Sequence, residues 1–160
     1  SCPDGYIVTG IGFDAGTWGG KPHYTGMKIV CSRVGGSNVF TTESETDSWM
    51  GFPSSVSSLG YLNGEIYTSL EGYFTTAGAP FFKHIWIEKT DVGNSETSWE
   101  NPPEQTSINT GVFDFATCQG DDGVINAISG FRIYSVQRDN GNIVIGGLLV
   151  LCTELAPPSS

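Results

Sequence analysis

The sequence predicts an all-β protein that contains three repeats of an antiparallel sheet. Its composition is the first observation: 22 of the 160 residues are Gly, 12% are aromatic and only 15% are charged. Strands and turns favour such residues, whereas amphipathic helices need many long charged side chains. The second observation is a hydrophobic pattern that occurs three times along the chain. We expect one domain, because a chain of this length can bury a single core.

Each repeat opens with a glycine and a hydrophobic run, and closes with a strand of alternating hydrophobic residues. The opening runs are 5–11, 60–66 and 123–128, and the closing runs are 27–31, 85–89 and 148–152. Similar spacing at both ends of the repeat argues against chance similarity. We place the repeats at about 1–53, 54–116 and 117–152, within a single domain 1–152 that is followed by a flexible tail, 153–160.

Turns and connectors divide the repeats into strands in chain order. The first repeat has a Gly/Pro-rich loop between its runs and a connector with Ser48-Trp49, and the second has a turn at 77–80 and a connector with Ser98-Trp99. In the third repeat, Asp139-Asn140-Gly141-Asn142 is typical of a hairpin turn, because Asn-Gly tolerates positive φ. One such sheet cannot bury its apolar face alone, so three sheets around a common axis, a β-prism, fit best. A β-sandwich or a trefoil-type barrel is the alternative.

The four cysteines follow the repeats. The first and third repeats each have a cysteine at the opening and at the closing position, while the second has neither and carries Lys89 at the closing position. A paired absence is what disulfides within a repeat predict, namely Cys2–Cys31 and Cys118–Cys152. Disulfides are typical of an oxidising compartment, so we expect a secreted, extracellular protein. No Cys-x-x-Cys pair indicates zinc and no acidic loop has calcium-binding spacing, so no metal or cofactor is expected.

The charge balance limits the partners. The formal net charge is −10, which disfavours nucleic acid because phosphate binding requires clustered Lys and Arg. No apolar run is long enough to cross a bilayer, so membrane insertion is not expected. Extracellular glycans, other coat or matrix proteins, and further copies of the chain in an oligomer or fibre remain as partners.

Three stretches carry a family resemblance. The string Cys2-Pro3-Asp4-Gly5-Tyr6, the closing strand 24–31 and the Ser-Trp connectors resemble the vitelline membrane outer layer protein family. The resemblance implies a secreted three-fold β-prism with disulfides, a structural role in an egg coat, and a cleft for oligosaccharides of N-acetylglucosamine type. The chain has half the cysteines expected of that family and lacks the Trp-bearing segment that precedes the opening cysteine there. The first sheet is therefore expected to lack a strand, which the C-terminal tail or another chain could supply at the open sheet edge.

Aromatic and acidic residues outside the hydrophobic runs are candidates for glycan binding. Aromatic rings in loops stack on sugar rings, and neighbouring carboxylates accept hydrogen bonds from sugar hydroxyls. Tryptophans that cap the ends of a prism are the competing interpretation, and no residue is predicted to be catalytic. The glycan candidates are Trp18, Trp49, Trp99, Glu43, Glu45, Asp47, Asp121 and Asp122.

The sequence thus predicts a secreted structural or coat protein with a carbohydrate-binding, lectin-like capacity and self-assembly through an open sheet edge. The alternative is a glycoside-active enzyme, in which two of the acidic residues would act as a carboxylate pair.

Overall fold

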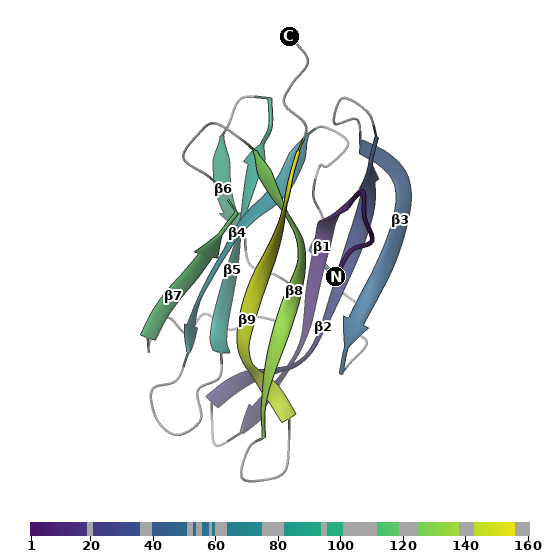
Figure 1. Cartoon of the computed structure of the whole chain (residues 1–160). Helices are drawn as coiled ribbons and strands as arrows, with labels where there is room; N and C mark the ends of the chain where they lie inside the picture. Colours follow the sequence, from purple (N-terminus) through teal and green to yellow (C-terminus); the bar gives the residue numbers. More distant parts are fainter. Residues whose placement is uncertain are drawn as a thin grey trace.

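A computed structural model describes residues 1–18, 21–35, 40–50, 53, 56–57, 59, 64–74, 82–93, 96–100, 112–118, 125–137 and 143–155. All regular structure in these residues is β-strand, as the composition predicted (Figure 1). The strands are β1 (Tyr6–Trp18), β2 (Lys21–Val34), β3 (Phe40–Trp49), β4 (Glu65–Phe74), β5 (Phe82–Asp91), β6 (Thr97–Glu100), β7 (Val112–Thr117), β8 (Asn126–Gln137) and β9 (Ile143–Glu154).

The strands form three open antiparallel sheets. Sheet A has the order β1-β2-β3, sheet B the order β6-β5-β4-β7, and sheet C consists of β8 and β9. Each sheet contacts the other two: β1 and β2 meet β8 and β9, β1 and β2 also meet β4 and β5, and β4 meets β8. The described strands therefore do not form the closed barrel of the trefoil alternative. The core lies between the three sheets (Figure 1).

The opening and closing runs of each repeat pair as one long hairpin. These hairpins are β1–β2, β4–β5 and β8–β9. In the third hairpin Gln137 pairs with Ile143, so the strands flank the predicted Asn-Gly turn, which itself lies outside the described residues. Alternation of buried and exposed side chains explains why these runs form strands that face a common core.

The three hairpins have the same irregularity. One extra residue interrupts the pairing on the first strand of each: Thr9 in β1, Thr68 in β4 and Ser129 in β8. Such β-bulges increase the local twist of a strand. The residue just before the bulge pairs with Cys31 in the first hairpin, with Lys89 in the second and with Cys152 in the third. The register thus places Lys89 at the position that a cysteine occupies in the other two hairpins.

The open ends of the hairpins also match. The amides of Val34, Val92 and Leu155 donate to the carbonyls of Gly5, Gly64 and Ile125, at 2.8, 2.9 and 2.9 Å respectively. The same ends contribute a second apolar cluster, formed by Ile7, Ile66, Ala127 and Leu155. Strand β9 continues past Cys152, where the sequence predicted the tail to begin, because Leu155 is buried in this cluster.

Both predicted disulfides are present, with Cα–Cα distances of 5.7 Å for Cys2–Cys31 and 5.6 Å for Cys118–Cys152. Cys118 follows β7 of sheet B, and Cys152 lies in β9 of sheet C. Cys2 is joined to β2 of sheet A, and its amide donates to the Ser129 carbonyl of sheet C at 2.8 Å. The Cys118–Cys152 disulfide therefore ties sheet C to the end of sheet B, while a hydrogen bond from Cys2 links sheet C to the segment that the other disulfide joins to sheet A. No helix in the described part of the chain could span a membrane.

Candidate functional site

An open groove of about 290 Å³ lies between sheets A and C. Its wall on sheet A comes from β2 and β3, and its wall on sheet C comes from the middle of β8. Ser1 also lines the groove. The lining residues are Ser1, Met27, Ile29, Asp47, Ser48, Trp49, Phe131, Arg132 and Ile133.

The register of β3 directs two of the predicted glycan candidates into this groove. Trp49 pairs with Met27, and Asp47 pairs with Ile29. Directly paired residues lie on the same face of a sheet, so both side chains share the face of the buried Met27 and Ile29. β3 ends here, because Met50 has a φ of 55° that interrupts the extended backbone.

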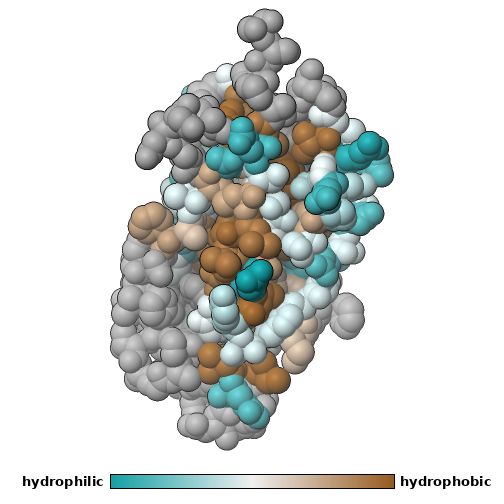
Figure 2. Space-filling view, viewed as in Figure 1, coloured by the Kyte–Doolittle hydropathy of each residue, from teal (hydrophilic) through white to brown (hydrophobic). Residues whose placement is uncertain are grey.

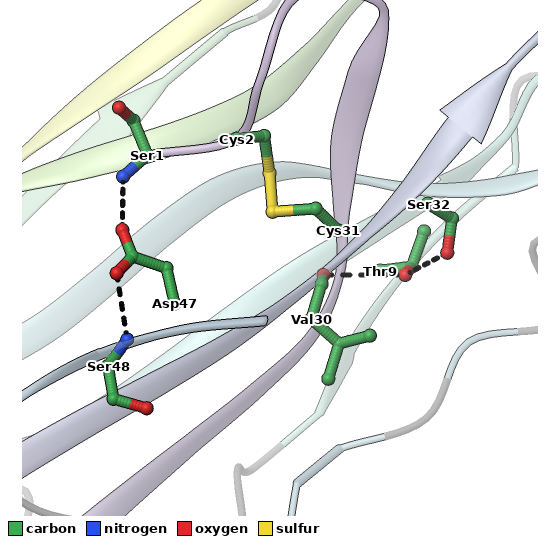
Figure 3. The surroundings of a disulfide bond; sticks show 8 residues. All are labelled: Ser1, Cys2, Thr9, Val30, Cys31, Ser32, Asp47 and Ser48. Carbon is green, nitrogen blue, oxygen red and sulfur yellow. Dashed lines mark hydrogen bonds and ion pairs between the residues drawn. A yellow bond between two sulfur atoms is a disulfide. The ribbon is translucent and has the colours of Figure 1, made fainter. Parts of the chain in front are cut away.

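Asp47 carries the fixed negative charge on the sheet A wall. Its Oδ2 accepts a hydrogen bond from the Ser1 ammonium at 2.8 Å, and its Oδ1 accepts one from the Ser48 amide at 3.0 Å (Figure 3). The hydrogen bond from the Ser1 ammonium, followed by its charge, outweighs partial burial and lowers the pKa of Asp47. Asp47 is therefore an ionised acceptor at neutral pH.

The opposite wall combines apolar surface with a cation. Phe131 and Ile133 are partly buried and pack against the main core, while Arg132 between them is exposed. The groove thus offers an aromatic ring on each wall, from Trp49 and Phe131, with a carboxylate and a guanidinium at its rim. This arrangement can stack on a ring with an apolar face and hydrogen-bond its substituents.

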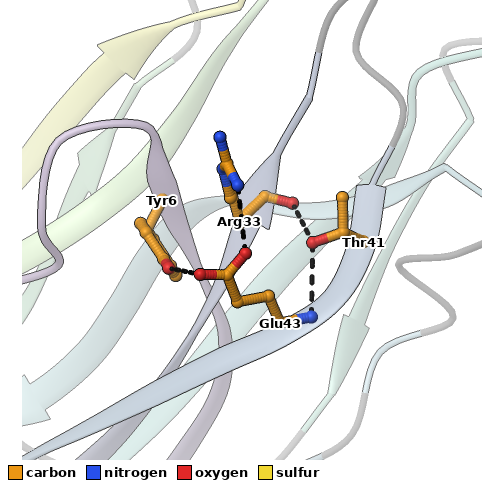
Figure 4. A network of polar contacts seen from close by, with 4 residues as sticks. All are labelled: Tyr6, Arg33, Thr41 and Glu43. Carbon is orange, nitrogen blue, oxygen red and sulfur yellow. Dashed lines mark hydrogen bonds and ion pairs between the residues drawn. The ribbon is translucent and has the colours of Figure 1, made fainter.

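Glu43 lies on the same strand as Asp47 but is engaged elsewhere. Its carboxylate accepts hydrogen bonds from the Tyr6 hydroxyl at 2.8 Å and from the Arg33 guanidinium at 3.1 Å (Figure 4). These two hydrogen bonds lower the pKa of Glu43, with that from Tyr6 the larger cause. Glu45 pairs with Cys31 and does not line the groove. Of the three acidic candidates on β3, only Asp47 therefore lines the groove.

The other candidates do not join the groove. Trp99 pairs with Glu88 in sheet B. Trp18 ends β1, and its side chain is outside the described part of the structure. Asp121 and Asp122 lie outside the described residues. Trp49 and Trp99, which looked equivalent in the sequence, thus stand on different sheets and in different registers.

Sequence reasoning missed the sheet C wall of the groove. Phe131 and Ile133 alternate in a strand, and nothing in the sequence indicates that they lie opposite Trp49. Arg132 is the only charged residue between Asn126 and Gln137, which is the one signal that could have drawn attention to this strand.

Comparison with known proteins gave no identification: no protein-family model matches the chain, and no curated protein matches its sequence. The resemblance to the vitelline membrane outer layer protein family therefore stays a prediction. No group of three or more His, Cys, Asp and Glu side chains that could hold a metal ion occurs among the described residues.

Proposed function

We propose that this chain is a secreted, disulfide-bonded structural module that binds carbohydrate in the groove between sheets A and C. The observation that carries the proposal is Trp49, whose ring lines an open groove beside the ionised Asp47 and opposite Phe131. Secretion is supported by the two disulfides, which persist in oxidising compartments.

We propose that the frame of this module is a three-fold β-prism, as the family resemblance implies. Support comes from the three hairpins, which share a bulge at Thr9, Thr68 and Ser129 and a hydrogen bond across each open end. A three-fold arrangement gives each sheet the same relation to its two neighbours, and each sheet here contacts both others. A β-sandwich would bring only two sheets face to face.

Binding without hydrolysis fits the electrostatics of the groove better than the enzyme alternative. A glycosidase needs two carboxyl groups beside the scissile bond, one of them with a raised pKa so that it can act as an acid. Asp47 is the carboxylate among the residues that line the groove, and its pKa is lowered. The groove therefore favours recognition of a neutral sugar by stacking and hydrogen bonding.

Titration with a neutral chitin oligosaccharide tests the proposal. Trp49→Ala should weaken binding about tenfold or more, since stacking of an aromatic ring contributes on the order of 1–2 kcal/mol. Trp49→Phe should retain most of the affinity, and Ile143→Ala, an exposed apolar position outside the groove, is the control that should change nothing. Equal affinity for the wild type and Trp49→Ala, or no response to any neutral glycan, would refute the binding role.

A second candidate function, self-assembly, is supported by the edge of β8. In sheet B the edge of β4 pairs with β7, which leads to Cys118, and the Cys118 amide donates to the Thr68 carbonyl at 2.7 Å. Cys2 makes the matching bond to Ser129, but no described strand pairs with β8 on that side beyond Ser129. Among the described strands, the edge of β8 in sheet C is therefore open beyond Ser129. The sequence predicted an open edge in the first sheet, where the outer edge of β1 likewise has no described strand beside it.

The surface of sheet C is apolar beside this edge. Figure 2 shows hydrophobic side chains gathered over β8 and β9, where Tyr134 is 55% exposed and Leu149 is also exposed. Edge strands with exposed apolar residues and few charges tend to pair with other chains, and Arg132 is the single charged residue of β8. We propose a second copy of the chain as the partner.

Light scattering over a range of concentrations tests this assembly. The wild type should form dimers or larger species, and Tyr134→Lys should shift it to monomer by placing a charge beside the edge. Phe115→Lys, at an exposed aromatic position on sheet B, should leave the assembly intact. A monomeric wild type at high concentration would exclude self-assembly and leave the carbohydrate proposal untouched.

A further inference from the structure

The outer face of sheet B carries an aromatic and acidic surface that lies apart from the groove. Pairing across the strands places its residues in two rows. Phe115, Glu71 and Trp86 form one row across β7, β4 and β5, and Ser69, Glu88 and Trp99 form the next row across β4, β5 and β6. We call these six residues the sheet B face.

The inner and outer faces of this sheet are distinguished by burial. Leu70, Ile85 and Ile87 alternate with the residues of the sheet B face and are buried in the core. Phe115 is 63% exposed and Trp99 is 44% exposed. Glu71 and Trp86 are partly exposed, so the face presents both its rings and its carboxylates to solvent.

Hydroxyl groups hold the second carboxylate in place. Glu88 Oε1 accepts hydrogen bonds from Thr68 at 3.0 Å and from Ser69 at 3.1 Å. Ser69 is in turn 2.7 Å from the Thr117 hydroxyl. Glu88 is therefore a fixed acceptor in the middle of the sheet, with Trp99 beside it on β6 and Trp86 two residues away on its own strand.

The two carboxylates are close enough to repel each other. Glu71 pairs with Trp86, two residues from Glu88, which makes Glu71 and Glu88 diagonal neighbours on one face. Partial burial and, second, the negative charge of Glu88 raise the pKa of Glu71. A bound cation would relieve this repulsion, and aromatic faces attract the same kind of charge.

We propose that the sheet B face binds a sugar chain that carries free amino groups, such as a glucosamine oligomer. Glu71 lies between two aromatic rings and Glu88 lies beside a third, which complements a ligand with positive charges on a chain of rings that have apolar faces. Phe115 and Trp86 flank Glu71 on both sides and are two strand spacings apart, which is about 10 Å, similar to the length of a disaccharide. Sugar rings would stack on the aromatic side chains while an ammonium group contacts Glu71 or Glu88.

This site does not depend on the groove, because none of its residues lines the groove. The groove is proposed to bind neutral, N-acetylated sugars, so the two sites differ in the charge of their ligands. Failure of one proposal therefore leaves the other standing.

Calorimetric titration of the full chain with a glucosamine hexamer at mildly acidic pH tests the inference, with the N-acetylated hexamer as comparison. Glu71→Gln should weaken binding of the amine form about tenfold, the loss expected for one charged hydrogen bond. Trp99→Ala should weaken binding of the amine form several-fold, because it removes an aromatic face that attracts the cation. Trp99 is exposed, so its loss leaves the core intact.

The chain is acidic, so a polycation will also bind it non-specifically, and a control of equal charge is required. Glu154→Gln removes one exposed carboxylate from sheet C and should change the affinity less than twofold. Equal losses for Glu71→Gln and Glu154→Gln would overturn the proposal. The proposal would also be overturned if the chain preferred a lysine oligomer of equal charge to the glucosamine hexamer and kept that preference in Trp99→Ala. A simple ion-exchange surface needs no aromatic ring.

Discussion

The buried hydroxyl pair at the first bulge makes a measurable prediction about how the hairpins are stabilised. Thr9 and Ser32 are both buried, and their hydroxyl oxygens are 2.6 Å apart. Thr9→Val preserves the shape of the side chain and leaves the Ser32 hydroxyl without this partner. A buried hydroxyl that loses its hydrogen bond costs about 1–3 kcal/mol. Thr9→Val should therefore lower the free energy of unfolding by about 2 kcal/mol and the melting temperature by about 4–8 °C.

A double-mutant cycle separates this pair from its surroundings. Ser32→Ala alone should cost about as much as Thr9→Val, although Thr9 retains a longer contact with the Val30 carbonyl at 3.4 Å. The double variant removes both hydroxyls, so neither is left buried without a partner. It should therefore lower the free energy of unfolding little more than either single change. The expected coupling energy is on the order of 1–2 kcal/mol, measured by urea unfolding with an unchanged m value.

Two further cycles make the test specific. Thr68 and Thr90 form the matching pair in the second hairpin, 2.8 Å apart, and should show coupling of similar size. The exposed ion pair of Arg33 and Glu43, at 3.1 Å, should show clearly weaker coupling, because solvent screens it. If the losses from Thr9→Val and Ser32→Ala simply add, the buried pair does not stabilise the bulge and the reasoning is wrong.

Three other predictions follow from the structure. Replacing Cys118 and Cys152 by Ala opens a loop with a sequence separation of 34 and should lower the free energy of unfolding by about 3–4 kcal/mol. Hydrogen exchange should increase first in β9. Unchanged stability in urea unfolding would contradict this prediction. Because the pKa of Glu71 is raised in the folded state, its contribution to stability is present below its ordinary pKa of 4.5 and is lost as pH rises through its folded-state pKa. Glu71→Gln should therefore be more stable than the wild type at pH 7 and equal to it near pH 4. A stability difference that does not change with pH would refute this. A Cβ at position 130 would lie 2.5 Å from Ser1 Cβ and 2.7 Å from Ser1 Cα. Gly130→Ala should therefore displace the N-terminal segment and increase hydrogen exchange at the Cys2 amide. Gly147→Ala is the control and should not, because a Cβ there would lie 3.6 Å from its nearest neighbour.

The hairpins and disulfides could be predicted because the information for them is local or repeated. Alternating hydrophobic residues define β2 and β9, and the absence of both cysteines from the second repeat identifies Cys2–Cys31 and Cys118–Cys152. Each of these inferences needs only the spacing of residues along the chain.

The candidate sites could be predicted only in part, because they depend on the register between strands. Trp49 and Trp99 follow similar connectors, yet one pairs with Met27 and the other with Glu88, which puts them on different surfaces. The row of Phe115, Glu71 and Trp86 joins residues from three strands, and no spacing in the sequence relates them. A bulge such as that at Thr68 also changes which residues face outward, and period-two alternation alone gives the wrong face beyond it.

The distribution of disulfides is explained by the width of the sheets. Sheet B has four strands and contains Lys89 in place of a cysteine, whereas sheet C has only two described strands. A two-stranded sheet is marginally stable unless other elements support it. The Cys118–Cys152 bond holds β9 to the end of β7, and the Cys2–Cys31 bond holds the segment that pairs with Ser129 of β8 to sheet A. The narrow sheet is thus anchored on one side by a covalent bond and on the other by a hydrogen bond to a segment that a disulfide fixes to sheet A, while the widest sheet is held by strand pairing.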